Sequence, residues 1–228
     1  MAIHIERHVP GPMFAFENRL DAGRKLAAFM KLDPDPNAIV LALPRGGVPV
    51  ARPLAVDLGV PVEPVVVRKL PIPASPEMGF GAVAIDGTTV LNEGVVRSFR
   101  IPEETIERVS EEVRREVERR AEAYAGTSEP PDVAGKTVYL VDDGLATGYS
   151  MLVAARMVAK RDPDSVIMAV PVSPITSVEL IDSVFDEKYC LIAQDSPPFA
   201  VAAFYRDFHE MTDDEVMTHL AAGARTGS

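Results

Sequence analysis

Apolar and polar residues along the 228-residue chain alternate with two periods, one typical of helices and one typical of buried strands. In the segment 18–32, small or apolar residues recur every three or four positions, which predicts an amphipathic helix ended by Asp33-Pro34. The inner face of this helix comprises Leu20, Gly23, Leu26, Ala27 and Met30. A second helix, with a strongly charged outer face, is predicted from Pro102 onward. Its apolar stripe comprises Ile106, Val109, Val113, Val117 and Tyr124.

Short continuous apolar runs predict buried strands, and helical patterns separate several of them. The strands are expected within 38–43, 62–70, 138–141, 165–172 and 188–193. Further helices are expected near 48–59, 150–160 and 175–184, with a short one near the C-terminus. A hairpin is expected around Asp86-Gly87. Because strands that alternate with helices usually pair in parallel, we predict a single α/β domain over 1–228, with helices on both faces of a parallel sheet.

The segment 71–81 is the exception to this regular pattern. It holds three prolines and two glycines, which disfavour both a helix and a central strand. It is also long for an ordinary connection, and long connections are often functional or disordered. We therefore expect a flexible loop at about 70–81.

Composition limits the binding partners and the cellular compartment that we expect for the protein. Lys and Arg number 23 and Asp and Glu number 34, so the formal net charge is −11. Such a surface repels polyanions, and nonspecific binding to nucleic acid or to an anionic membrane is not expected. No apolar run reaches the roughly 20 residues of a membrane helix, and the N-terminus lacks the apolar core of a signal peptide. Cys190 is the only cysteine, so we expect a buried thiol and a cytoplasmic protein.

One stretch, VYLVDDGLATGYSM at 138–151, joins a predicted strand to two aspartates, a glycine-bounded turn and a helix start. Gly144 and Gly148 permit backbone angles that other residues avoid, so amides of the turn can converge on one point. The positive end of the following helix lies at the same point, which is the usual arrangement of an anion site. Thr147 adds a hydroxyl donor.

The two aspartates of this stretch, Asp142 and Asp143, need a different partner, because they would repel the anion. Vicinal ribose hydroxyls can donate to them, and a Mg²⁺ carried by the ligand can also bind them. The stretch therefore predicts a site for a sugar phosphate. The chain contains neither the P-loop pattern nor the glycine pattern of dinucleotide-binding folds.

These residues resemble the 5-phosphoribosyl-1-pyrophosphate (PRPP) binding motif of the type I phosphoribosyltransferases. Three further segments agree in order: LALPRGGVPVA resembles their pyrophosphate loop, VVVRKLPIPASPEMGFGAVA their flexible-loop segment, and FAVAAFYRDF their hood over the base site. The resemblance covers roughly residues 18–220 and is nearest to a branch of uncharacterised bacterial proteins. It implies a Rossmann-like phosphoribosyltransferase core with a small hood at about 194–210.

The resemblance also implies an activity and a set of site residues. The activity is Mg²⁺-dependent transfer of the 5-phosphoribosyl group from PRPP to a small nitrogenous acceptor, such as a nucleobase, with release of pyrophosphate. Asp142 and Asp143 would bind the ribose hydroxyls. The 5′-phosphate would bind to Gly144, Leu145, Ala146, Thr147 and Gly148. Pyrophosphate would bind to Arg45, Gly46, Gly47, Arg68 and Lys69.

Four assignments complete this expected site. Arg45 and Lys69 would act catalytically by neutralising the departing pyrophosphate. Phe199 would stack on the base, and Asp207 resembles an acidic metal contact of the purine-specific branch. A homodimer is one candidate assembly, and the sequence does not define the oligomeric state.

Two other functions stay open. A PRPP sensor would keep the sugar-phosphate site and transfer nothing, and Ala146 favours it because related 6-oxopurine enzymes carry an acidic residue there. A receiver-like α/β domain that uses the acidic pair to bind Mg²⁺ is a third hypothesis. The LPRGG loop argues against it. The sequence DDGLATG is closer to the adenine-type pattern, but it does not define the acceptor. The four histidines show no metal-ligand spacing.

Overall fold

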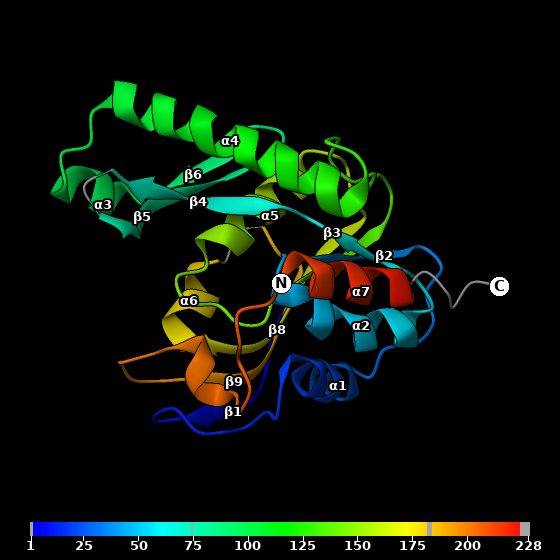
Figure 1. Cartoon of the computed structure of the whole chain (residues 1–228). Coiled ribbons are helices and arrows are strands. Elements are labelled where there is room, and N and C mark those ends of the chain that lie inside the picture. The colour runs from blue at the N-terminus through cyan, green and yellow to red at the C-terminus, as the bar shows by residue number, and fades with distance from the viewer. Residues whose placement is uncertain (1, 74, 182–183, 224–228) are drawn as a thin grey trace.

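The computed structural model describes residues 2–73, 75–181 and 184–223, and its centre is a six-stranded sheet (Figure 1). The strands are β1 (Ala2–Val9), β2 (Ala38–Ala42), β3 (Val62–Pro64), β7 (Thr137–Val141), β8 (Ser165–Pro174) and β9 (Glu187–Gln194). They lie in the order β1-β9-β8-β7-β2-β3, and all neighbours are parallel. The predicted parallel α/β fold is confirmed, whereas the edge strand β1 was not predicted.

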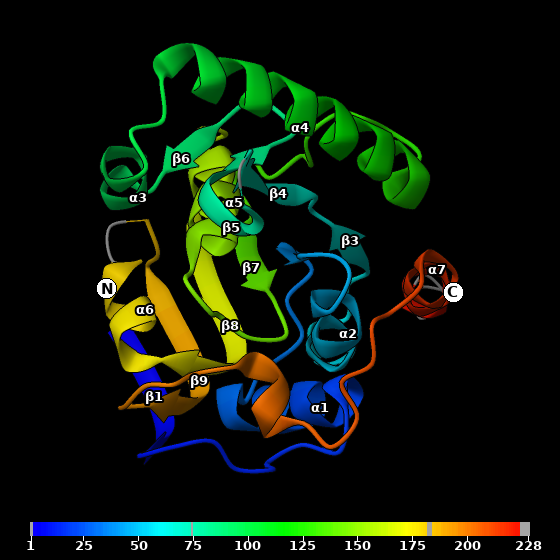
Figure 2. The same cartoon turned by 60° about the vertical axis from the view of Figure 1, so that its left-hand side comes forward.

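Helices cover both faces of this sheet, as Figure 2 shows. On one face, α1 (Arg19–Met30) and α2 (Gly47–Leu58) pack against each other and against the strands. On the other face lie α5 (Tyr149–Ala159) and α6 (Ile175–Leu180), while α7 (Asp213–Gly223) packs on α2 beside β3. The helix expected at 175–184 includes residues 182–183, which lie outside the described residues. The helices lie on opposite faces because right-handed crossovers that run along the sheet in opposite directions put their helices on opposite sides.

A second, antiparallel sheet lies above α5. It comprises β4 (Val67–Ile72), β5 (Ser75–Ala84) and β6 (Thr89–Leu91), with β5 in the middle. The long helix α4 (Glu103–Ala125) covers its outer side, and the short α3 (Glu93–Ser98) follows β6 (Figure 1). The apolar stripe of α4 is largely buried, and the turn at Asp86-Gly87 joins β5 to β6 as predicted.

Two predictions about the segment 62–84 are wrong. The single strand expected at 62–70 is divided between the two sheets, since β3 belongs to the first and β4 to the second. The segment 71–81, expected to lack regular structure, is largely strand, because β4 pairs with β5. Pro71 is tolerated because β4 is an edge strand and the register shifts on both sides of this residue.

The strand order reverses at one place in the main sheet. From β2 the chain passes through α2 to β3 on one side, whereas from β7 it passes through α5 to β8 on the other. The reversal therefore falls between β2 and β7. In open α/β sheets a crevice for ligands forms at such a point, at the carboxyl ends of the strands.

Candidate functional site

The two motif loops leave the sheet side by side at this reversal point. Ala42 of β2 and Val141 of β7 are paired residues at the carboxyl ends of their strands. Just beyond them, the Leu43 amide donates to the Val141 carbonyl at 2.9 Å. The loop with Arg45 and the loop with the two aspartates therefore begin next to each other, although about a hundred residues separate them in sequence.

The turn after β7 is shaped for close approach. A Cβ added at Gly144 would lie 2.7 Å from a Val201 methyl group, so only glycine fits under this side chain. Gly148 has φ +78° and precedes α5. The Leu145 amide donates to Val172 O at 2.9 Å, which fixes the turn to β8. Because this amide is already used, Leu145 cannot contribute it to an anion.

A cavity of about 190 Å³ opens at this turn. Its lining comprises Asp142, Gly144, Leu145, Ala146, Thr147, Gly148, Ser150 and Met151. Within the described part of the chain, the amides of Ala146 and Thr147 donate to no protein group, and both residues are exposed. Ser177 Oγ donates to the Ala146 carbonyl at 2.9 Å and so holds the peptide from behind. Free amides, the Thr147 hydroxyl and the N-terminus of α5 form a suitable site for an anion.

The two carboxylates at the end of β7 differ in their partners. Asp143 Oδ2 accepts a hydrogen bond from Arg19 Nε at 2.7 Å, while Asp142 Oδ1 accepts one from the Asp143 amide at 2.8 Å. Burial raises the pKa of Asp142 well above its ordinary value, and the Asp143 charge raises it further. Burial also raises the pKa of Asp143, although Arg19 opposes this rise. Such a pair fits a ligand that supplies hydroxyl donors or positive charge.

The loop after β2 lies directly against these carboxylates. A Cβ added at Gly46 would lie 1.9 Å from Asp143 Oδ2, and one added at Gly47 would lie 2.6 Å from the Val141 carbonyl. Both glycines are therefore required by the contact between the two loops. Arg45 lies in the same loop, but its side chain extends to the C-terminal segment. There its guanidinium donates to Glu210 Oε1 at 2.6 Å and to the Met211 carbonyl.

Arg68 and Lys69 lie on β4, above the first sheet. Arg68 donates to Glu116 Oε1 of α4 at 2.7 Å. Burial lowers its pKa, and the nearby charges of Arg120 and Arg45 lower it further. Lys69 is exposed, and its aliphatic chain lies next to Gly79 of the paired strand. The structure thus brings Arg68 into the electrostatic range of Arg45, while it ties the Arg68 side chain to α4.

The hood is a compact aromatic segment around a 3₁₀ helix, η1 (Val201–Phe204). Phe199 is half-buried, with its ring 5.7 Å from that of Phe204. Tyr205 is buried, and its hydroxyl donates to the Asp143 carbonyl at 2.6 Å. Together with the contact between Val201 and Gly144, this hydrogen bond seats the hood on the acidic turn. Phe199 packs against Phe204 of this segment, and its stacking on a base stays a prediction.

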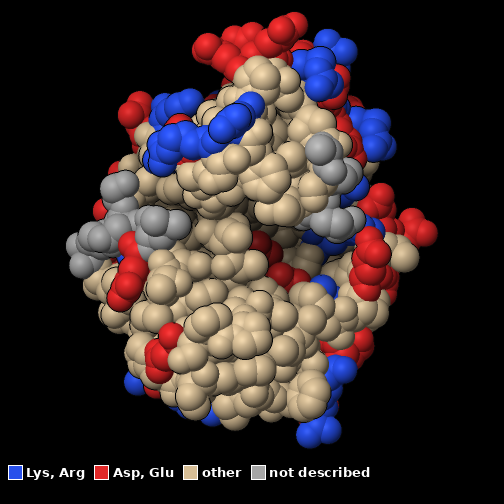
Figure 3. Space-filling model, turned by 90° about the vertical axis from the view of Figure 1, so that its left-hand side faces the viewer, with Lys and Arg blue, Asp and Glu red and all other residues tan. Residues whose placement is uncertain are grey.

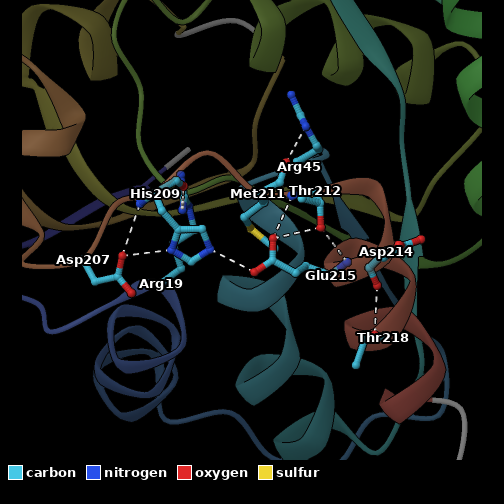
Figure 4. Close-up of polar contacts among 9 residues, drawn as sticks. All are labelled: Arg19, Arg45, Asp207, His209, Met211, Thr212, Asp214, Glu215 and Thr218. Carbon is cyan, nitrogen blue, oxygen red and sulfur yellow. Dashed lines mark hydrogen bonds and ion pairs between the residues drawn. The ribbon is translucent and has the colours of Figure 1, made fainter.

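Asp207 lies outside the cavity at the turn 144–148. Its carboxylate contacts His209 Nδ1 at 2.9 Å, and His209 Nε2 in turn contacts Glu215 at 3.0 Å (Figure 4). The contact with His209 lowers the pKa of Asp207. These three residues line a second cavity of about 220 Å³, which shares no lining residue with the first. Within the described residues, no group of three or more His, Cys, Asp or Glu side chains could hold a metal ion.

Two residues of the site carry no motif and were not predicted. Arg19, in the first turn of α1, is separated from Asp143 by 124 residues, and no local pattern indicates the pairing. Tyr205 was read only as a hood or core aromatic, because a hydroxyl that reaches a backbone carbonyl leaves no trace in sequence. The expectation for Cys190 is confirmed, since the thiol is buried and burial raises its pKa to about 12.

Figure 3 shows a hollow between two mainly tan parts of the surface, with acidic side chains visible inside it. Among the described residues, no helix has the length and apolar character needed to span a membrane.

Fold and site together define an α/β protein with a glycine-bounded turn and two carboxylates at the reversal point of its sheet. The sequence matches the family model of the phosphoribosyl transferase domain over residues 14–202. This match covers most of the chain, so the protein belongs to the phosphoribosyl transferase family. The type I phosphoribosyltransferase resemblance of the motifs is confirmed.

Individual relatives agree with this assignment. Proteins from two strains of Mycobacterium tuberculosis, named as candidate phosphoribosyl transferases, are 38% identical over 208 residues, which is 91% of this chain. The match covers 47% of their length, so the chain spans about half the length of the curated relatives it matches. The crystal structure of the protein TT1426 from Thermus thermophilus is similar at 36% identity with a TM-score of 0.72, covering 92% of this chain and 99% of that one.

Proposed function

We propose that this protein transfers the 5-phosphoribosyl group of PRPP to a nitrogenous acceptor and releases pyrophosphate. The observation that carries the proposal is the contact between the two motif loops, in which Gly46 lies against the Asp143 carboxylate. In PRPP the pyrophosphate is attached to C1, beside the ribose hydroxyls. A protein that binds PRPP therefore needs its pyrophosphate loop to adjoin its ribose carboxylates, and this geometry supports that arrangement.

The residues then divide the ligand among them. The cavity at 144–148 would take the 5′-phosphate through the amides of Ala146 and Thr147, while Asp142 and Asp143 would accept hydrogen bonds from the ribose hydroxyls. The loop with Arg45 would take the pyrophosphate. During transfer the C1–O bond to pyrophosphate breaks as the acceptor nitrogen bonds to C1, and the acceptor proton leaves to solvent. The chain supplies orientation, charge neutralisation and exclusion of water.

Mg²⁺ is the cofactor that fits this chemistry. It usually keeps several waters and binds to substrate phosphates with at most a few carboxylates, rather than in a cage of protein ligands. The described residues offer no such cage, and the two ribose carboxylates fit an ion that arrives with PRPP. When bound, Mg²⁺ would neutralise charge on the departing pyrophosphate. Asp207 is a weaker candidate contact, because His209 already occupies its carboxylate.

The acceptor can be found by measuring pyrophosphate release from PRPP and Mg²⁺ across purine, pyrimidine and other nitrogenous compounds. We expect release that depends on one class of acceptor. Arg45→Ala should lower this turnover more than it lowers PRPP affinity, because negative charge on the leaving group grows in the transition state.

A non-catalytic PRPP sensor is the second candidate. The observation that favours it is Ala146, which is exposed in the turn where related 6-oxopurine enzymes carry an acidic side chain. PRPP binding without pyrophosphate release for any acceptor would select the sensor over the enzyme.

A further inference from the structure

Arg19 is the buried cation of the site, and it lies outside every motif of the sequence. Its side chain is only 10% exposed and belongs to the first turn of α1. The guanidinium Nε donates to Asp143 Oδ2 at 2.7 Å, and a terminal nitrogen donates to the His209 carbonyl at 3.0 Å. The Phe208 ring lies 3.9 Å from the guanidinium carbon. These three contacts hold the group from different sides, and Figure 4 shows Arg19 next to His209.

The pairing has consequences for Asp143. Its side chain is 15% exposed, and a carboxylate so far from water is costly unless a partner compensates its charge. The planar guanidinium also restricts rotation of the carboxylate, because Nε is fixed by the other two contacts. Arg19 donates to Oδ2, so Oδ1 does not share this partner and would be the atom that accepts a hydrogen bond from a ligand.

The fit is tight on the opposite side as well. A Cβ added at Gly46 would lie 2.9 Å from Arg19 Nε as well as 1.9 Å from Asp143 Oδ2. The pyrophosphate loop therefore approaches the ion pair closely, and neither partner can move toward it. Helix α1 thus contributes a fixed charge to a site whose other parts come from β2 and β7.

We propose that Arg19 is a positioning residue, which orients the Asp143 carboxylate so that it accepts a ribose hydroxyl. This inference rests on the proposed binding of a phosphoribosyl ligand. It assigns to α1 a role in sugar recognition, since the charge on α1 acts through Asp143 and does not itself touch the sugar.

The test compares the affinities of ribose 5-phosphate and 2-deoxyribose 5-phosphate by calorimetry. We expect the wild-type protein to prefer the ribose form by about tenfold, the effect of one hydrogen bond to a charged group. Arg19→Gln should reduce this preference toward one, while it leaves the affinity for the deoxy form nearly unchanged because the phosphate binds elsewhere. Arg19→Lys, which keeps the charge without the planar fork, should restore part of the preference.

Arg52→Gln is the matched control. Arg52 contacts His219 of α7 at 3.2 Å. Arg52→Gln therefore removes an arginine charge, as Arg19→Gln does, but leaves the ion pair between Arg19 and Asp143 in place. The preference for ribose should then stay at the wild-type value. Should Arg19→Gln fail to fold, Arg19→Lys is measured in its place, and it should lower the preference in part because the planar fork is lost.

The outcomes separate the two proposals. Wild-type preference retained in Arg19→Gln, or in Arg19→Lys if Arg19→Gln is unfolded, would overturn the role of Arg19. A wild-type protein that binds neither sugar phosphate, or binds both equally, would instead reject the ribose site itself.

Discussion

At the scale of single residues, the carboxylates of the site lower the stability of the fold, and we attribute their presence to ligand binding. Asp142 and Asp143 are adjacent carboxylates at the end of a buried strand, where burial and mutual repulsion disfavour their charged forms. Asp143 is paired directly with Arg19, whereas Asp142 accepts a hydrogen bond from the Asp143 backbone amide and feels the Arg19 charge from farther away. Such unfavourable arrangements are typical of functional sites.

Asp142→Asn should therefore stabilise the protein at neutral pH and abolish PRPP binding. The folded-state pKa of Asp142 is raised, so the stability present below the unfolded pKa is lost as pH rises through the folded pKa. The variant does not titrate there, and its advantage should be about 1.4 kcal/mol for each unit of displacement. Urea unfolding at neutral and at acidic pH measures it. The gain should shrink in acid, and an equal gain at both pH values would contradict this cause.

Gly46→Ala tests the contact between the loops. The added methyl group would overlap Asp143 Oδ2, so the carboxylate must rotate away from its position. We expect PRPP affinity to fall about tenfold or more, since one charged hydrogen bond to the ribose is lost. Gly11→Ala is the control, because a Cβ there meets no atom within 4 Å. If calorimetry gave the same PRPP affinity for both variants, the two loops could not form one site.

At the scale of elements, the C-terminal segment 206–212 crosses the site and holds Arg45. Glu210 places a carboxylate on the guanidinium that would bind pyrophosphate, so the protein and the ligand compete for the same donors. Glu210→Gln should therefore raise pyrophosphate affinity, by a few fold since Glu210 is largely exposed. Asp214→Asn removes the same charge from neighbouring α7 and should have little effect. Equal affinities of the two variants, measured by calorimetry, would exclude this competition.

The hairpin of β4 and β5 is the element whose amide exchange we expect a ligand to change. Its strands are paired, yet the register shifts at Leu70/Pro71 and Pro71/Ile72 interrupt the ladder before the tip. Hydrogen bonding near such irregularities is weaker, so the described amides beside these two register shifts should exchange rapidly without ligand. We predict that PRPP with Mg²⁺ slows this exchange, as closure over the site would require. Identical amide exchange at saturating ligand would instead mean a static hairpin.

The same segment explains how far the sequence could predict elements. Helices α1, α2, α4 and α5 follow their apolar periodicity, and the strands of the main sheet follow their continuous apolar runs. Proline and glycine content misled the prediction at 71–81. For Pro71 the reason is that the edge strand β4 tolerates a proline that a central strand excludes. β1 was missed because its polar residues His4, Glu6 and His8 hide the edge strand of a parallel sheet.

At the scale of the whole molecule, the sequence predicted what is local and missed what is distant. The acidic pair, the glycine turn and the LPRGG loop are contiguous motifs, so their residues could be found and grouped. Three hydrogen bonds join segments that are distant in sequence. They link Arg19 to Asp143, Arg45 to Glu210, and the Tyr205 hydroxyl to the Asp143 carbonyl. No periodicity or spacing encodes such contacts, since they arise only when the fold is formed.

A calorimetric titration with PRPP, in the presence and absence of Mg²⁺, is the decisive measurement for the proposed site. Calorimetry detects binding without knowledge of the acceptor, so it applies to an enzyme and to a sensor alike. We predict saturable binding of one PRPP per chain that strengthens with Mg²⁺ and is lost in Asp142→Asn. Absence of binding at millimolar PRPP with Mg²⁺ present, by a protein shown to be folded, would contradict the assignment of this site.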